Sequence, residues 1–212
     1  MNTISEYKQI IQSFRDYKIV SRITEPEGQL FIRHDVDFDL DLAVELAKIE
    51  YKMGVRAVYF VMVTSPYYNI FSEEFGIFEI LELGHDVLLH YDHKFDWKLQ
   101  LDIFTDFMGY CPDLISMHRP RNTDKLDANP IKIESTYSDR YSKDAKYFSD
   151  ANCLWRYGYP EPQVGLRTVQ LMTHPVWWMI EGEGEAEKCA NFIKYREGKL
   201  KKELHKSLRT YV

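Results

Sequence analysis

Four short apolar runs in the first 120 residues alternate with segments whose apolar residues recur at helical spacing. The runs are rich in β-branched and aromatic residues, which is typical of buried strands. They cover residues 29–34, 57–63, 86–89 and 114–117. Helices are predicted over residues 5–17, from Asp39 or Asp41 to Gly54, over 72–83 and over 96–110. This β, α, β, α, β, α, β order predicts a parallel sheet with crossover helices.

The second half of the chain has a less regular pattern. Residues 124–162 contain several turn formers and two short predicted strands, near 135–138 and 146–149. A late strand is predicted over 168–172, and a long amphipathic helix over about 185–208. Without repeats or an evident linker, we expect one α/β domain over residues 1–212, with its core at about 28–180.

Composition and charge exclude some classes of protein. The 212 residues carry a net charge of −6, which argues against a nucleic-acid partner. The three cysteines form no CxxC pair and fit a reducing compartment. The N-terminus lacks the apolar core of a signal peptide, and no run approaches the roughly 18–20 apolar residues of a membrane helix. We therefore expect a cytoplasmic protein without a transmembrane segment.

Ionisable side chains follow four of the predicted strands. Active sites of parallel α/β folds lie at the C-terminal ends of the strands, which meet at one edge. The first strand ends in Asp35 and Asp37, and the others end in histidine-containing segments. The histidines at these ends are His34, His90, His93, His118 and His174, five of the seven in the chain. This convergence predicts a site built from carboxylate and imidazole groups.

The residues at these strand ends suit metal-assisted hydrolysis. Asp35 and Asp37 point the same way on a continuing strand, so one can bind a divalent ion while the other acts as a base. Catalytic zinc takes about three protein ligands, and a histidine can protonate a leaving amine. A carboxylate pair that only caps a helix is the alternative for the two aspartates. His34 is expected to be structural because it lies inside the strand, whereas His93 is either a ligand or an exposed loop residue.

Five motifs resemble those of one enzyme family, in the family's order. Residues 33–37 (Arg-His-Asp-Val-Asp) resemble the opening of the divergent polysaccharide deacetylases. These belong to carbohydrate esterase family four, whose shared region is the nodulation-B homology domain. The later motifs lie at residues 84–92, 117–120, 148–156 and 171–175. The resemblance spans roughly residues 30–178.

The resemblance implies a single-domain distorted (β/α) barrel of about seven strands. It also implies a metal-dependent hydrolase that removes an acyl group from an amino sugar. By position, Asp35 would be the general base, His174 the general acid, and Arg119 the residue that orients the base. Asp37 and His90 would bind the metal. The residues implied on the substrate side are Tyr91, Asp150 and Trp155.

The chain departs from the family pattern at the third metal ligand. Better-known members have a second histidine four residues after the first, where this chain has Lys94. His118 is our first choice for the third ligand, with Asp92 and His93 as alternatives. Zinc is the expected metal, with cobalt or nickel as alternatives.

The resemblance also implies a biological role, in the biosynthesis of a surface polysaccharide such as O-antigen or capsule. The amino-sugar substrate would be nucleotide-linked, lipid-linked or an oligosaccharide. Two other hypotheses stay open. One is a catalytically inactive barrel that binds a glycan or a protein partner, motivated by Lys94. The other is an amidase for a C–N bond outside sugars.

Overall fold

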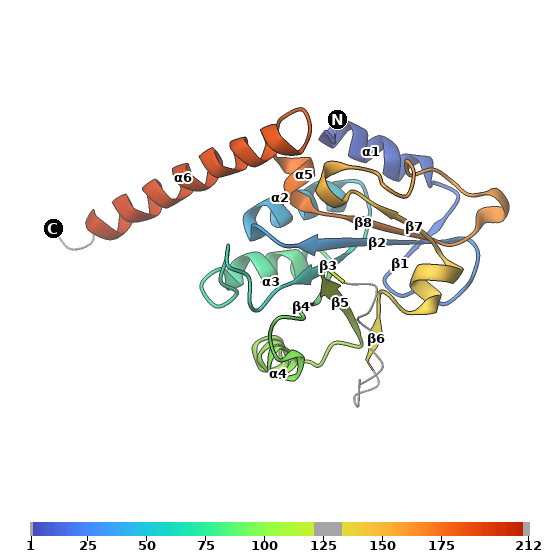
Figure 1. The fold of residues 1–212 in the computed structure, drawn as a ribbon, viewed down its shortest axis with the longest axis horizontal. Helices are drawn as coiled ribbons and strands as arrows, with labels where there is room; N and C mark the ends of the chain where they lie inside the picture. The colour runs from blue at the N-terminus through green and yellow to red at the C-terminus, as the bar shows by residue number, and fades with distance from the viewer. Residues whose placement is uncertain (1, 121–132, 210–212) are drawn as a thin grey trace.

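A parallel sheet with helices packed against its outer face forms the body of the protein (Figure 1). The computed structural model describes residues 2–120 and 133–209. Residues 124–132 of the segment predicted to be irregular lie outside that description. The strands are β1 (Lys18–Val20), β2 (Gln29–Val36), β3 (Val58–Val61), β4 (Asp86–Asp92), β5 (Leu114–His118), β6 (Glu134–Ser135), β7 (Lys146–Ser149) and β8 (Val169–Thr173). The α-helices are α1 (Ile4–Ser13), α2 (Leu40–Lys52), α3 (Glu74–Glu82), α4 (Trp97–Met108), α5 (Pro175–Met179) and α6 (Glu185–Arg209).

The strand order is β6-β5-β4-β3-β2-β8-β7, and β1 pairs with β2 beside this path. All neighbouring strands along this order are parallel, both on the side from β2 to β6 and on the side from β2 through β8 to β7. This curved parallel sheet confirms the prediction of a distorted (β/α) barrel of about seven strands. Short helical turns, η1 (Arg140–Asp144), η2 (Ala151–Cys153) and η3 (Val164–Leu166), connect the later strands.

Local sequence signals explain the boundaries of the first helices. Thr3 caps α1, because its hydroxyl accepts a hydrogen bond from the backbone N–H of Glu6 at 3.2 Å. Asp39 caps α2 by accepting from the backbone N–H of Leu42 at 3.1 Å. Of the two candidate caps for this helix, Asp39 is therefore the one used.

The two faces of the sheet bury different sets of side chains. The outer face packs against the helices in a large apolar core that includes Leu30, Ile32 and Val36 of β2. The inner face carries a second, smaller cluster that includes Phe31 and Phe60. Because both faces are covered, all eight residues of β2 are buried, as expected for a central parallel strand.

One β-strand and one α-helix were not predicted from the sequence. β1 has only three residues, too few to produce a periodic signal. Helix α5 follows β8 directly and begins at Pro175, in the first helical position that proline favours. The predicted C-terminal helix is present as α6, which extends away from the sheet toward the C-terminus (Figure 1).

Candidate active site

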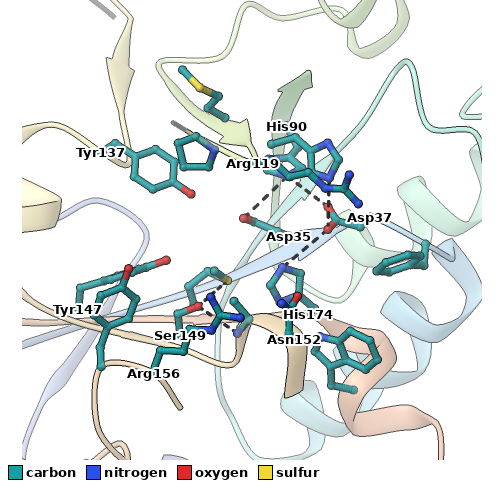
Figure 2. Close-up of a pocket in the computed structure, with 18 residues that line it drawn as sticks. Asp35, Asp37, His90, Arg119, Tyr137, Tyr147, Ser149, Asn152, Arg156 and His174 are labelled. Atoms are coloured by element: carbon teal, nitrogen blue, oxygen red, sulfur yellow. Dashed lines mark hydrogen bonds and ion pairs between the residues drawn. The ribbon is translucent and has the colours of Figure 1, made fainter. Parts of the chain in front are cut away.

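Alternation along β2 determines which side chains reach the site. Successive residues of a strand point to opposite faces, so Phe31, Arg33 and Asp35 share the inner face. The inner face therefore changes from apolar to charged along the strand, and Asp37 follows just beyond its end. In Figure 2, Asp35 and Asp37 lie together between His90 and His174.

Asp35 is a buried carboxylate held in its ionised form by Arg33. The Arg33 guanidinium donates a 2.8 Å hydrogen bond to Oδ2 of Asp35, and the Ser116 hydroxyl lies 3.4 Å from Oδ1. Burial raises the pKa of the Asp35 carboxyl, but the charges of Arg33, His90 and His174 outweigh this effect. The pKa of the Asp35 carboxyl therefore lies below its usual value. Asp35 is ionised at neutral pH and can accept a proton.

Arg33 is fully buried and is itself fixed from three sides. It donates to the side-chain carbonyl of Gln170 at 3.2 Å and to the hydroxyl of Tyr137 at 2.9 Å. Its guanidinium carbon also lies 4.9 Å from the centre of the Tyr137 ring. The resemblance had assigned the orientation of Asp35 to Arg119, which stays a prediction, whereas the contact that the structure shows comes from Arg33. Arg119 lies past the end of β5 and is exposed, whereas Arg33 lies two positions from Asp35 on the same face.

Three histidines surround Asp37. Nε2 of His90 lies 3.2 Å from Oδ1 of Asp37, while Nε2 of His118 and Nε2 of His174 each lie 3.7 Å from Oδ2. Burial raises the pKa of Asp37, but the contact with His90 and the charges of the three imidazoles lower it to about 2. The four residues come from the ends of β2, β4, β5 and β8, as the strand-end pattern predicted.

Two of these histidines are supported from behind by a second carboxylate. His174 Nδ1 lies 2.6 Å from Oδ1 of Asp150, whose Oδ2 accepts a 2.8 Å hydrogen bond from the indole of Trp178. His118 Nδ1 lies 3.6 Å from Oδ2 of Asp92. A carboxylate behind an imidazole fixes the orientation of its ring and directs the other nitrogen toward the site.

The pKa values of the two supported histidines move in opposite directions. Burial lowers the pKa of His174, but the charge of Asp150 and its hydrogen bond outweigh this and raise it to about 9. The pKa of His118 is lowered, first by burial and then by the nearby charges of His90 and Arg119 against the attraction of Asp37. His174 is therefore a cation at neutral pH, and His118 is a neutral imidazole.

The residues around Asp37 suit a divalent metal ion in type, and one of the separations between them matches zinc. Neighbouring ligand atoms of tetrahedral zinc lie about 3.3 Å apart, from bond lengths of about 2.0–2.1 Å. The 3.2 Å separation between His90 and Asp37 matches this value, and the 3.7 Å separation of His118 is slightly wider. Oδ1 of Asp37 is buried, and its contact with Nε2 of His90 is an ion pair that lacks hydrogen-bond geometry, so this oxygen has no hydrogen bond among the described residues. Within residues 2–120 and 133–209, no group of three or more such side chains is close enough to hold an ion as it stands. The types of donor present and the carboxylate oxygen without a hydrogen bond nevertheless fit a metal.

A cavity of about 270 Å³ opens over these residues. Asp35, Asp37, His90, His118 and His174 all line it, and Figure 2 shows the labelled ones facing one another. Its other walls come from β5, β7 and β8, from the segments that follow β5, β6 and β7, and from α5. The residues there include Arg119, Tyr137, Tyr147, Ser149, Asn152, Arg156 and Trp177.

Three residues implied on the substrate side lie elsewhere. Tyr91 is 4% exposed and packs in the outer core, because it alternates with the inward-facing His90. Trp155 packs against Trp178, with ring centres 6.0 Å apart, and Asp150 is fully buried behind His174. None of the three lines the cavity. Tyr137, Tyr147 and Trp177 form the aromatic wall that the sequence assigned to Tyr91 and Trp155.

The alternatives for the third ligand also have clear positions. His93 turns away from the cavity, with its Nδ1 3.3 Å from the backbone carbonyl of His118. Asp92 lies behind His118 and also accepts from the backbone N–H of Lys94 at 2.9 Å. His34 is fully buried between Thr173 and Glu50, which agrees with its expected structural role.

Comparison with known proteins gave matches among solved structures alone. No family model and no curated protein matches the sequence. The peptidoglycan deacetylase PdaC from Bacillus subtilis matches with 15% identity and a TM-score of 0.46, over 89% of this chain and 99% of that chain. The Bc1960 peptidoglycan N-acetylglucosamine deacetylase matches with 13% identity and a TM-score of 0.47, over 96% and 92%. The Bdellovibrio bacteriovorus peptidoglycan deacetylase Bd3279 matches with 9% identity and a TM-score of 0.37, over 88% and 46%.

These neighbours carry the name of the enzyme class that the sequence motifs resemble. Because their identities are below 16% and their TM-scores below 0.5, we base the function on the geometry of this chain. One further structural finding concerns membranes: no helix in the described part of the chain is both long and apolar enough to span one.

Proposed function

We propose that this protein is a metal-dependent hydrolase that removes an acyl group from the nitrogen of an amino sugar. The observation that carries the proposal is the grouping of Asp35, Asp37, His90, His118 and His174 around one cavity. It combines an ionised base, a cationic acid and a set of metal donors, which together provide each role that amide hydrolysis requires.

Asp37, His90 and His118 would hold the ion, with zinc as the first choice and cobalt or nickel as alternatives. The ion would supply Lewis-acid polarisation of the acyl carbonyl. His118 suits the third position because it is a neutral imidazole, whereas His174 is protonated and paired with Asp150.

Asp35 would accept a proton on one side of the acyl group, and His174 would donate a proton on the other. Asp35 accepts a proton from water as the water oxygen bonds to the acyl carbon. When the C–N bond breaks, His174 donates its proton to the departing amine nitrogen, which leaves a free amino sugar and a carboxylic acid. Arg33 keeps the base ionised and aimed, and Asp150 keeps the acid charged.

The cellular setting is part of the proposal. We place the reaction in the cytoplasm, in the assembly of a surface polysaccharide such as O-antigen or capsule. All three cysteines, Cys111, Cys153 and Cys189, are unpaired, which supports a reducing compartment.

Acyl release and metal content test the proposal together. Purified protein would be incubated with N-acylated sugars, sugar nucleotides, oligosaccharides and non-sugar amides, and acetate or formate would be measured. We expect release from a sugar substrate, about one equivalent of metal, and loss of that metal in His90→Ala. Asp35→Asn should retain the metal and abolish turnover, whereas Asp41→Asn, an exposed aspartate on α2, should change neither.

Two results would contradict the proposal. A protein that neither contains nor binds added zinc, cobalt or nickel would favour the inactive, glycan-binding barrel. Release confined to non-sugar amides would favour the general amidase.

A further inference from the structure

Two arginines line the cavity without taking part in holding Asp35. Arg119 follows β5, and Arg156 follows the η2 turn. Both are exposed, and in the view of Figure 2 they lie on opposite sides of Asp35. Among the described residues, neither side chain forms a hydrogen bond or an ion pair with another group. Two guanidinium groups therefore face the cavity with their donors available to a ligand.

The backbone at the cavity wall is held in an uncommon conformation. Arg119 has a φ of 52°, in the left-handed region that arginine seldom adopts, and Asn152 has a φ of 56°, in the same region that asparagine adopts more readily. Both residues line the cavity. Strained backbone of this kind is often found at ligand sites. The strained residue Arg119 therefore lies at the cavity wall.

Arg119 and Arg156 are positively charged groups in an acidic protein and beside two ionised carboxylates. The chain has a net charge of −6, and Asp35 and Asp37 add two ionised carboxylates at the cavity floor. A neutral oligosaccharide would leave both guanidinium groups without an anionic partner. A phosphate group carries up to two negative charges and presents several oxygens to the planar fork of arginine.

We propose that the substrate is an N-acyl amino sugar that carries a phosphate ester, bound by Arg119 and Arg156. This deepens the proposed function, since it names the class of sugar on which the same site acts. The phosphate belongs to a nucleoside diphosphate or to a lipid diphosphate, both of which present the same ester next to the sugar. Arg119 and Arg156 are then residues that determine specificity, and the chemistry remains with Asp35 and His174.

Binding measurements test the phosphate site without requiring turnover. Isothermal titration of the Asp35→Asn protein would compare N-acetylglucosamine 1-phosphate with N-acetylglucosamine. We expect the phosphorylated sugar to bind at least about tenfold tighter, since a hydrogen bond between two charged groups is stronger than one between neutral groups. Adding Arg119→Gln or Arg156→Gln should remove that advantage. Arg15→Gln changes an exposed arginine just beyond the end of α1, and this matched control should leave the advantage intact.

Two further measurements sharpen the result. Raising the ionic strength from about 0.05 M to about 0.5 M should weaken binding of the phosphorylated sugar and leave the neutral sugar unaffected, because salt screens exposed charges. Arg119→Lys keeps the charge but loses the two-pronged geometry, so it should show intermediate affinity. Melting temperatures of all variants would confirm that they are folded.

The outcomes separate this proposal from the hydrolase itself. Equal affinity for the neutral and phosphorylated sugars, or an equal loss in Arg15→Gln, would overturn the phosphate site even if acyl release were observed. Conversely, a protein that releases no acyl group from any substrate can still show the arginine-dependent affinity. Acyl release from uridine diphosphate N-acetylglucosamine and from a prenyl-diphosphate-linked sugar in detergent micelles would then identify the source of the phosphate.

Discussion

Arg33 donates a 2.8 Å hydrogen bond to Asp35, two positions further along the same strand, and both side chains are buried. A charge that is fully enclosed beside a carboxylate stabilises the ionised form of that carboxylate strongly. The same strand therefore supplies the base of the reaction and the group that keeps it ionised.

Removing Arg33 should move the acidic limit of activity. In Arg33→Gln the pKa of Asp35 rises, because the charge that lowers it is lost. Activity needs ionised Asp35, so it is present above the Asp35 pKa and lost as the pH falls through it. The acidic limb of kcat/KM should therefore lie at higher pH in the variant, while Arg33→Lys should lie nearer the wild type. If Arg119→Gln moved this limb instead, Arg119 would be the residue that holds the base.

The third metal ligand can be identified by a pair of neighbouring histidines. His118→Ala should lose more metal affinity than the about 10–100-fold that an outer partner contributes, because a donor atom itself is removed. His93→Ala should retain the metal, since His93 turns away from the cavity. Metal content after dialysis, measured by mass spectrometry, would decide between them. Asp92→Asn should fall in the range of an outer partner, and a greater loss there would make Asp92 the ligand.

Asp150 should set the alkaline limit of activity through His174. The proton of His174 is needed in the reaction, so activity is lost as the pH rises through its pKa of about 9. Asp150→Asn removes the main cause of that raised pKa, and the alkaline limb of the pH–rate profile should move to lower pH. His174→Ala should lower kcat by about 10²–10⁴-fold at pH values below about 9, and the difference from the wild type should shrink at higher pH. An unchanged alkaline limb in Asp150→Asn would exclude His174 as the acid.

A buried polar cluster on the outer face should contribute to stability rather than to catalysis. Glu50 is fully buried, accepts hydrogen bonds from Tyr7 and Tyr59, and lies 2.9 Å from Nε2 of His34. Glu50→Gln should lower the free energy of unfolding by about 3 kcal/mol at neutral pH, because buried donors lose a charged acceptor. Urea denaturation would measure this.

The pH dependence and a control on the same helix make the Glu50 prediction specific. Burial raises the pKa of Glu50, but His34 and the hydrogen bonds lower it below the usual value. Its contribution is therefore present above the pKa of the unfolded chain and is lost as the pH falls through the folded value. The difference between Glu50→Gln and the wild type should shrink in acid. Glu45→Gln, an exposed partner of Lys48, should cost less than about 1 kcal/mol.

Most of the fold and the location of the site could be predicted from the sequence. Alternating strands and helices with the right periods gave the parallel sheet, and its strand ends brought Asp37, His90, His118 and His174 together. This succeeds because the parallel topology places every strand end at one edge, whatever the exact register.

The direction of individual side chains was harder to predict. Tyr91 follows His90 on β4, so the two point to opposite faces, and alternation alone excludes Tyr91 from the cavity. The same rule, counted back from Asp35, identifies Arg33 as an inward-facing residue. Trp155 could not be placed in this way, because the η2 turn before it depends on the positive φ of Asn152, which no periodic pattern indicates.

The two faces of β2 also determine which changes in chain length the protein can accept. Leu30, Ile32 and Val36 point to the outer core, while Arg33 and Asp35 point to the inner face, where Asp35 lines the cavity. Inserting or deleting one residue within this strand would exchange the faces, placing charges among the helices and apolar groups at the reaction centre. Folding and activity therefore both depend on the same alternation of side chains between the two faces of β2. Length variation among homologous or engineered forms should be confined to the connecting loops.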